Sequence, residues 1–223
     1  MQNAIDSFTN DPFIIEGDLL VKYAGSEDTL VIPEGITAIK EGAFDGVKLR
    51  SILIPEGVRV IGEYAFAHTK LTTVHIPATV TSIGEGAFAI KSLQAITVSQ
   101  ENLHFTSGEG ILFDKSLQTL IAYPRGKEGA HYGIPSGLRI IGDYAFTETP
   151  VSSVSIPRGV GLIGSYAFAH TKLTSVSIPS SVSKIGTHAF AFCRQLINVE
   201  LSRITKVHRD TFIASPVQLR YRD

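Results

Sequence analysis

The sequence predicts a repeat solenoid, a fold in which short β-coils stack along one axis. An Ile-Pro pair occurs six times, and consecutive prolines are 22 residues apart except between Pro77 and Pro135. After each of these prolines an Ala-Phe pair follows, with its phenylalanine 11 residues after the proline. A fixed period of this length is typical of solenoids, whose units bury their apolar side chains only by covering one another.

The unit spanning residues 71–88 shows the expected order of elements within one coil. Val74 alternates with polar neighbours, as in a half-buried strand, and Pro77 ends that strand because proline donates no ladder hydrogen bond. Gly84 is expected to relax the backbone before a short turn or 3₁₀ segment that carries Phe88 inward. We expect Phe88 and its counterparts in neighbouring coils to be buried in one continuous stack of rings.

Two segments depart from the simple unit and resemble each other. The 58-residue gap between Pro77 and Pro135 holds one altered repeat and about 14 additional residues. Within it, residues 110–115 followed by 119–124 predict a β-hairpin. Residues 18–23 followed by 29–33 are expected to form its N-terminal counterpart. We expect a loose tail, residues 1–12, followed by a single domain, residues 13–223. Within the domain, residues 13–33 are expected to form a hairpin cap and residues 203–223 a C-terminal cap. Residues 99–133 are expected to form an enlarged repeat that contains the hairpin insertion.

The unit L-x-x-V-x-I-P-x-x-V-x-x-I-G-x-x-A-F resembles the BspA-like (Treponema-type) leucine-rich repeats over about residues 13–221. The 23-residue form of that repeat has a cysteine three residues after the phenylalanine, and Cys193 occupies this position. Elsewhere Thr69, Thr149 and Thr171 hold the same position, where a small side chain can bond to the turn backbone. A parallel β-helix is the rival interpretation. We favour the leucine-rich repeat because the Ala-Phe segment resembles a helical turn more than a third strand.

The resemblance implies a right-handed leucine-rich-repeat superhelix with a parallel sheet on one face and turns or 3₁₀ segments opposite. It also implies a non-enzymatic binding module of a bacterial cell-surface, adhesin-type protein. Such proteins engage host or extracellular-matrix proteins, for example fibronectin or fibrinogen. The alternative is an intracellular structural or scaffolding repeat protein. The N-terminus as given has neither a basic stretch nor an apolar stretch of the kind found in a signal peptide.

Composition excludes several other classes of protein. Apolar residues make up 43% of the chain, which argues against disorder, and the net charge of -1 argues against bulk binding to nucleic acid. No apolar run approaches the ~18 residues needed to cross a bilayer, so membrane insertion is not expected. The single cysteine rules out an intrachain disulfide and a cysteine-cluster metal site.

The sequence predicts no catalytic, cofactor-binding or metal site. Cys193 and His188 suggest a nucleophile and base, but Cys193 falls in the structural position of the repeat, with no third group to orient the histidine. His68 and His170 have identical contexts but lie four coils apart, too far to share a metal ion. Tyr144 and its counterparts Tyr64, Tyr166 and His188 suggest a ring ladder or, less favoured, an aromatic platform for a sugar or peptide.

Strand residues that point away from the core predict a protein-binding sheet face. Most of them are small and uncharged, and parallel sheets usually have both faces covered, so a bare face is a candidate contact surface. The candidate residues are Ser51, Leu53, Thr73, His75, Thr97, Ser153, Ser155, Ser175, Ser177, Asn198 and Glu200. The alternative is that serine and threonine only keep an exposed sheet soluble.

Charge is distributed unevenly along the chain. Residues 1–63 carry 11 acidic and 5 basic side chains, whereas residues 151–223 carry 3 and 9. In a solenoid, order in the sequence is order in space, so one end should be acidic and the other basic. The candidate basic end comprises Arg203, Lys206, Arg209, Arg220 and Arg222. We expect a monomer or weak head-to-tail association, or attraction of an acidic partner.

Overall fold

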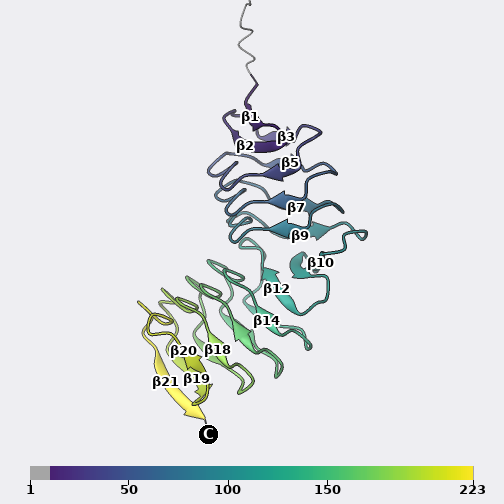
Figure 1. Cartoon of the computed structure of the whole chain (residues 1–223). Helices are drawn as coiled ribbons and strands as arrows, with labels where there is room; N and C mark the ends of the chain where they lie inside the picture. The colour runs from purple at the N-terminus through teal and green to yellow at the C-terminus, as the bar shows by residue number, and fades with distance from the viewer. Residues whose placement is uncertain (1–10, 223) are drawn as a thin grey trace, which may run out of the picture.

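The computed structural model describes residues 11–222 and shows a solenoid of β-coils (Figure 1). Of the expected N-terminal tail, only Asp11 and Pro12 fall within the described residues. A regular coil contains a longer strand that ends one or two residues before the proline, a strand of two residues, and a series of turns that carries the Ala-Phe pair. The turns replace the expected 3₁₀ segments, and no helix occurs between residues 11 and 222.

The longer strands lie in parallel and form the broad face of the solenoid. In this series Val74 pairs with Ile96, and both side chains are buried between the coils. The strands are β3 (Thr29–Val31), β5 (Ser51–Leu53), β7 (Thr73–Ile76), β9 (Ala95–Val98), β13 (His131–Gly133), β15 (Ser153–Ser155), β17 (Ser175–Ser177), β19 (Asn198–Ser202) and β21 (Gln218–Arg222).

The two-residue strands form the second series of parallel ladders. Most of them hold one buried side chain, and Ile61 and Ile163 are fully buried, whereas both residues of the last strand of the series are exposed. The strands are β4 (Ala38–Ile39), β6 (Val60–Ile61), β8 (Ser82–Ile83), β14 (Ile140–Ile141), β16 (Leu162–Ile163), β18 (Lys184–Ile185) and β20 (Lys206–Val207).

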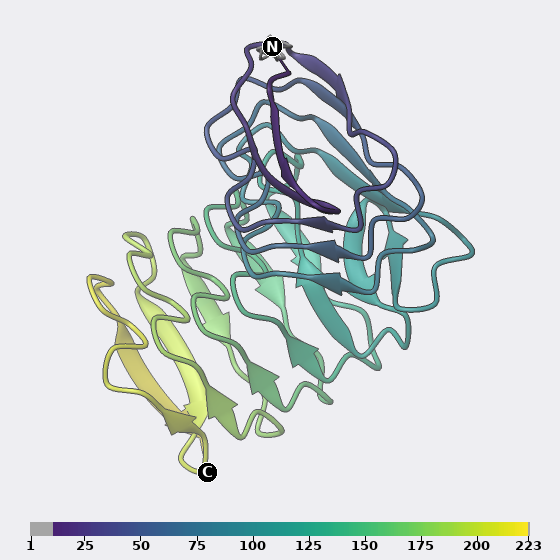
Figure 2. The same cartoon turned by 45° about the horizontal axis from the view of Figure 1, so that its top comes forward.

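Antiparallel strands begin each half of the second series and divide the solenoid into two stacks. The first sheet runs β1-β2-β4-β6-β8, with β1 (Phe13–Glu16) and β2 (Leu19–Tyr23) as its hairpin. The second runs β10-β11-β12-β14-β16-β18-β20, beginning with β10 (Phe105–Gly108), β11 (Ile111–Asp114) and β12 (Thr119–Ala122). Figures 1 and 2 show the two stacks joined at an angle near these strands.

The expected N-terminal hairpin was wrong in its pairing. Strand β2 pairs antiparallel with β1, whereas β3 pairs in parallel with β5 and is the first strand of the broad face. The physical reason is that the chain from Asp11 to Glu16 reaches back along β2 and takes the edge that β3 would have needed. In the middle of the chain β11 pairs with β12, and β10 adds a strand that the sequence did not indicate.

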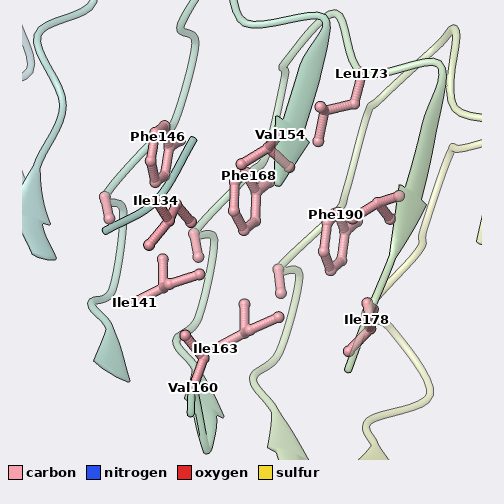
Figure 3. Packing of buried hydrophobic residues seen from close by; sticks show 14 of the residues in the cluster. Ile134, Ile141, Phe146, Val154, Val160, Ile163, Phe168, Leu173, Ile178 and Phe190 are labelled. Carbon is pink, nitrogen blue, oxygen red and sulfur yellow. The ribbon is translucent and has the colours of Figure 1, made fainter. Parts of the chain in front are cut away.

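The phenylalanine rings form two stacks, so the expectation of one continuous stack was wrong. Phe66 and Phe88 stack with centroids 6.1 Å apart in the first half, and Phe146 and Phe168 at 4.9 Å in the second (Figure 3). All four rings are buried, with at most 7% exposed. The stack is interrupted after Phe88 because the next segment pairs as β10, β11 and β12 and does not add another Ala-Phe turn.

The glycine before each turn has a different role from the one expected. A Cβ on Gly84 would lie 2.4 Å from the backbone nitrogen of Glu63 in the preceding coil, and one on Gly186 would lie 2.5 Å from that of Ser165. Neither glycine has a left-handed backbone. The position therefore requires glycine because adjacent coils approach closely there, and not to relax the chain.

Candidate functional site

The candidate sheet-face residues occupy the outward side of the longer strands. Nine of the eleven side chains are exposed, and Asn198 and Glu200 are half-buried beside the last strand, β21. The inward residues between them, such as Val154 and Val176, are buried in the core. Alternation along the strand therefore places these residues on one side, with no layer of the described chain packed over them.

The face is divided into two patches. Strand β9 packs against β10 and β11, and no contact joins it to β13 among residues 11–222. The first-stack patch comprises Ser51, Leu53, Thr73, His75 and Thr97. The second-stack patch comprises Ser153, Ser155, Ser175, Ser177, Asn198 and Glu200. The sequence predicted a single broad face because it showed the hairpin insertion but not where the inserted strands lie.

The first-stack patch has an apolar edge that the sequence analysis missed in part. Val31 is 62% exposed and pairs in register with Leu53, which is 54% exposed. The signal for Val31 was its place two residues before Pro33, the same place that Leu53 has before Pro55. Further along, the ring Nδ1 of His75 lies 3.0 Å from the hydroxyl of Thr97. This patch thus offers apolar contact at one end and hydrogen-bonding groups at the other.

Four of the six residues of the second-stack patch are serines. Ser153 and Ser175 lie on one row of the sheet, and the ring Nδ1 of His131 lies 3.1 Å from the hydroxyl of Ser153. His131 belongs to this row, and sequence reasoning overlooked it because the strand before Pro135 lacks the usual apolar pattern. At the C-terminal side the patch ends at Glu200, which is paired with Arg222.

All five residues of the candidate basic end are exposed in the last coils. Three of the five charged groups contact other side chains. Arg222 pairs with Glu200, Arg209 Nε lies 3.4 Å from Asp210 Oδ2, and the guanidinium of Arg203 lies 5.5 Å from the centre of the Tyr221 ring. Strand β21 is exposed along its whole length.

The tyrosine positions form a ring ladder. Tyr144 and Tyr166 stack with centroids 4.9 Å apart, and Tyr166 and His188 at 4.8 Å. All three have a left-handed backbone, with φ between 54° and 59°. Partial burial and the hydrogen bond to Tyr64 raise the pKa of the Tyr144 hydroxyl. Because each ring face is covered by the next ring, the ladder favours internal stacking over an open aromatic platform.

Cys193 has the environment of a structural residue. Its side chain is fully buried, and Sγ lies 3.0 Å from the carbonyl oxygen of Phe168 and 3.3 Å from the hydroxyl of Thr171. Burial raises the pKa of the thiol, which disfavours the nucleophilic thiolate. Thr69 and Thr149 in the same repeat position donate to the turn carbonyls of Phe66 and Phe146, as expected for this position.

The histidines are dispersed. His68 Nδ1 lies 2.8 Å from Asp45 Oδ1, whereas His170 stacks on Phe192. Within residues 11–222, no group of three or more histidine, cysteine, aspartate or glutamate side chains is arranged to hold a metal ion. His188 Nδ1 is buried with no hydrogen-bond partner in the described part of the chain, and its ring contacts Tyr166.

The repeats decide the family. A model of the BspA type leucine rich repeat region matches in six copies over residues 22–124 and 130–220. The chain belongs to the BspA-type leucine-rich repeat family. The unmatched gap, residues 125–129, lies between β12 and β13, where the hairpin insertion returns to the regular stack.

Solved structures of bacterial leucine-rich repeat proteins share the fold. A leucine-rich repeat protein from Eubacterium ventriosum is 26% identical with a TM-score of 0.73, covering 81% of this chain and 55% of that one. A leucine rich cell surface protein from Faecalibacterium prausnitzii is 29% identical with a TM-score of 0.68, covering 86% and 59%. The pneumococcal vaccine antigen PcpA, 20% identical with a TM-score of 0.56 and covering 86% and 68%, shares the fold alone.

This BspA-type chain spans less than two thirds of the length of the first two of these structures. No curated protein matches its sequence. Between residues 11 and 222, no helix has the length and apolar character needed to cross a membrane. The predicted leucine-rich-repeat fold is confirmed by the family and by these structures.

Proposed function

We propose that this chain is a non-enzymatic protein-binding module of a bacterial cell-surface protein, and that it engages host or extracellular-matrix proteins in the manner of an adhesin. One observation carries the proposal. Nine exposed side chains, most of them small and uncharged, point outward from parallel strands that no other layer within residues 11–222 covers. The similarity to a protein described as a leucine rich cell surface protein supports the proposed location at the cell surface.

The second-stack patch is proposed as the principal contact. Hydroxyl-bearing side chains on neighbouring strands offer hydrogen bonds over a flat area, and they lose little side-chain entropy when they are ordered by a partner. The apolar pair Val31 and Leu53 extends the contact surface on the first stack, where burial of exposed apolar area favours association.

The test introduces charge on the second-stack patch. A variant with glutamate at Ser153, Ser155, Ser175 and Ser177 should lose binding to extracellular-matrix proteins by at least about tenfold, because each buried unpaired carboxylate opposes association. Surface plasmon resonance with immobilised fibronectin, fibrinogen and collagen measures it.

A matched control places glutamate at exposed serines on the two-residue strands and turns away from this face, and we select Ser82 and Ser183. The control should bind like the parent chain. If the parent binds a matrix protein and the four-glutamate variant binds it equally well, the patch is not the contact. If the parent binds none of the matrix proteins, the adhesin assignment fails.

A further inference from the structure

A cavity of about 250 Å³ lies at the junction between the two stacks, on the side of the turns. Its walls come from three segments that are far apart in the sequence. They are the last turn of the first stack (residues 83–89), strand β12 with the residues after it (119–125), and the first turn of the second stack (142–147). The cavity therefore exists only because two stacks meet there.

The last turn of the first stack presents two backbone donors to this cavity. Within the first stack, the N–H groups of Tyr64 and Phe66 donate to the carbonyls of Glu85 and Ala87 in the next turn, each at 3.0 Å. The corresponding N–H groups of Gly86 and Phe88 have no acceptor among residues 11–222. Both residues line the cavity, so its wall carries donors suited to a carbonyl or carboxylate oxygen.

Two carboxyl groups lie within hydrogen-bond distance of each other in the wall of this cavity. Glu85 and Asp143 hold the same position in their turns, although one belongs to each stack, and both line the cavity. Partial burial, repulsion by Asp143, a hydrogen bond to Asp143 and the nearby charge of Glu63 raise the pKa of Glu85, in that order. Asp143 also accepts the backbone N–H of Ser165.

The positive charge in the wall does not offset these carboxylates. The Arg125 side chain is only 10% exposed, and its Nη1 lies 2.9 Å from Glu148 Oε2. No lysine, arginine or histidine within residues 11–222 forms a salt bridge with Glu85 or Asp143. Apolar side chains, among them Ile83 and Ala87, and the ring of Tyr144 complete the lining.

We propose that this junction cavity binds an arginine residue, with its guanidinium on the carboxyl pair Glu85 and Asp143 and its carbonyl or carboxylate oxygen on the N–H groups of Gly86 and Phe88. A planar guanidinium pairs with carboxylates in a bidentate manner. The volume lies below the ~300 Å³ at which drug-sized pockets begin and above the ~150 Å³ that holds benzene, a size suited to one amino-acid residue.

The arginine can be the free amino acid or part of a peptide, and two probes distinguish these sources. Isothermal titration calorimetry of the whole chain uses L-arginine and the capped peptide acetyl-Gly-Arg-Gly-amide. Binding of both or of either one supports the site and identifies the source, whereas binding of neither overturns the proposal. A peptide with citrulline in place of arginine has the same shape without the charge, and equal binding of that peptide also overturns it.

Variants locate the site. Glu85→Gln should weaken arginine binding at least about tenfold, since the variant loses the charge on one partner of the ion-paired hydrogen bond. Asp143→Asn should do the same while its amide oxygen still accepts the N–H of Ser165. Glu41→Gln is the matched control, because Glu41 holds the same repeat position two coils away from the cavity. If Glu41→Gln weakens binding as much as Glu85→Gln, the cavity is not the site.

The binding should also depend on pH. The groups that face Glu85 are Asp143, Glu63 and the Tyr144 hydroxyl, and the guanidinium pairs with the ionised form of Glu85, whose pKa burial and Asp143 raise. Affinity should therefore fall as pH is lowered through the raised pKa of Glu85, and Glu85→Gln should remove most of that dependence. The sheet-face proposal is independent of this site, because charge on Ser153 or Ser175 leaves the cavity unaltered.

Discussion

Tyr64 and Tyr144 meet edge to face across the junction between the two stacks, with ring centroids 6.1 Å apart and planes at 80°. Gly86 holds the same repeat position in the turn between them. A Cβ on Gly86 would lie 2.4 Å from Cε1 of Tyr64. The missing side chain at Gly86 therefore lets Tyr64 reach past its own stack and contact the first ring of the next ladder.

This contact predicts a coupling between Gly86 and Tyr64. Gly86 has φ of 63°, so Gly86→Ala should cost about 1–2 kcal/mol from backbone strain and more because the Tyr64 ring must move. In a Tyr64→Ala background the same substitution should cost only the strain. Urea denaturation of the parent, the two single variants and the double variant gives the coupling energy. Strictly additive effects would show that the ring is not displaced.

The ring stack of the second half predicts a large loss on truncation. Phe146 is fully buried between Tyr123 and Phe168, so Phe146→Ala should lower the free energy of unfolding by about 3–5 kcal/mol. Leu103 is 80% exposed, and Leu103→Ala should change it by no more than about 0.5 kcal/mol. A loss below ~1 kcal/mol for Phe146→Ala would contradict the observed burial.

The carboxyl pair at the junction predicts a dependence of stability on pH. Because the pKa of Glu85 is raised in the folded chain, its contribution to stability is present at acid pH and is lost as pH rises through that pKa. Glu85→Gln should thus equal the parent at acid pH and exceed it in stability at neutral pH. Urea denaturation at acid and at neutral pH measures the free energy of unfolding of the variant and of the parent. If the advantage of Glu85→Gln over the parent becomes smaller as pH rises, the prediction is wrong.

The charge gradient predicts salt-sensitive association of the ends. The acidic N-terminal third and the basic last coils, with Arg220 exposed on β21, should attract each other in separate molecules at low ionic strength. Light scattering should show a higher mean mass at low salt than at ~0.15 M, where screening acts beyond about 8 Å. The basic last coils should also bind heparin at low salt. A monomer at every salt concentration that does not bind heparin would leave the gradient without this role.

Local periodicity made much of this fold predictable from the sequence. The alternation around Val74, the proline that ends each strand and the recurrent Ala-Phe pair are repeated at a fixed interval, so each copy supports the assignment of the others. The structural role of the Cys193 position was predictable for the same reason, because Thr69, Thr149 and Thr171 occupy the same position of the turn in other coils. The outward side of the strands follows directly from their two-residue period.

The tertiary structure alone decided how the regular units are interrupted. Strand edges compete for partners, and the sequence does not state that β1 takes the edge of β2 or that β10 and β11 separate β9 from β13. The division of the sheet face, the two ring stacks and the cavity between Glu85 and Asp143 all follow from that competition. Repeat spacing determines what one coil looks like, whereas long-range strand pairing determines where a stack stops and the next one begins.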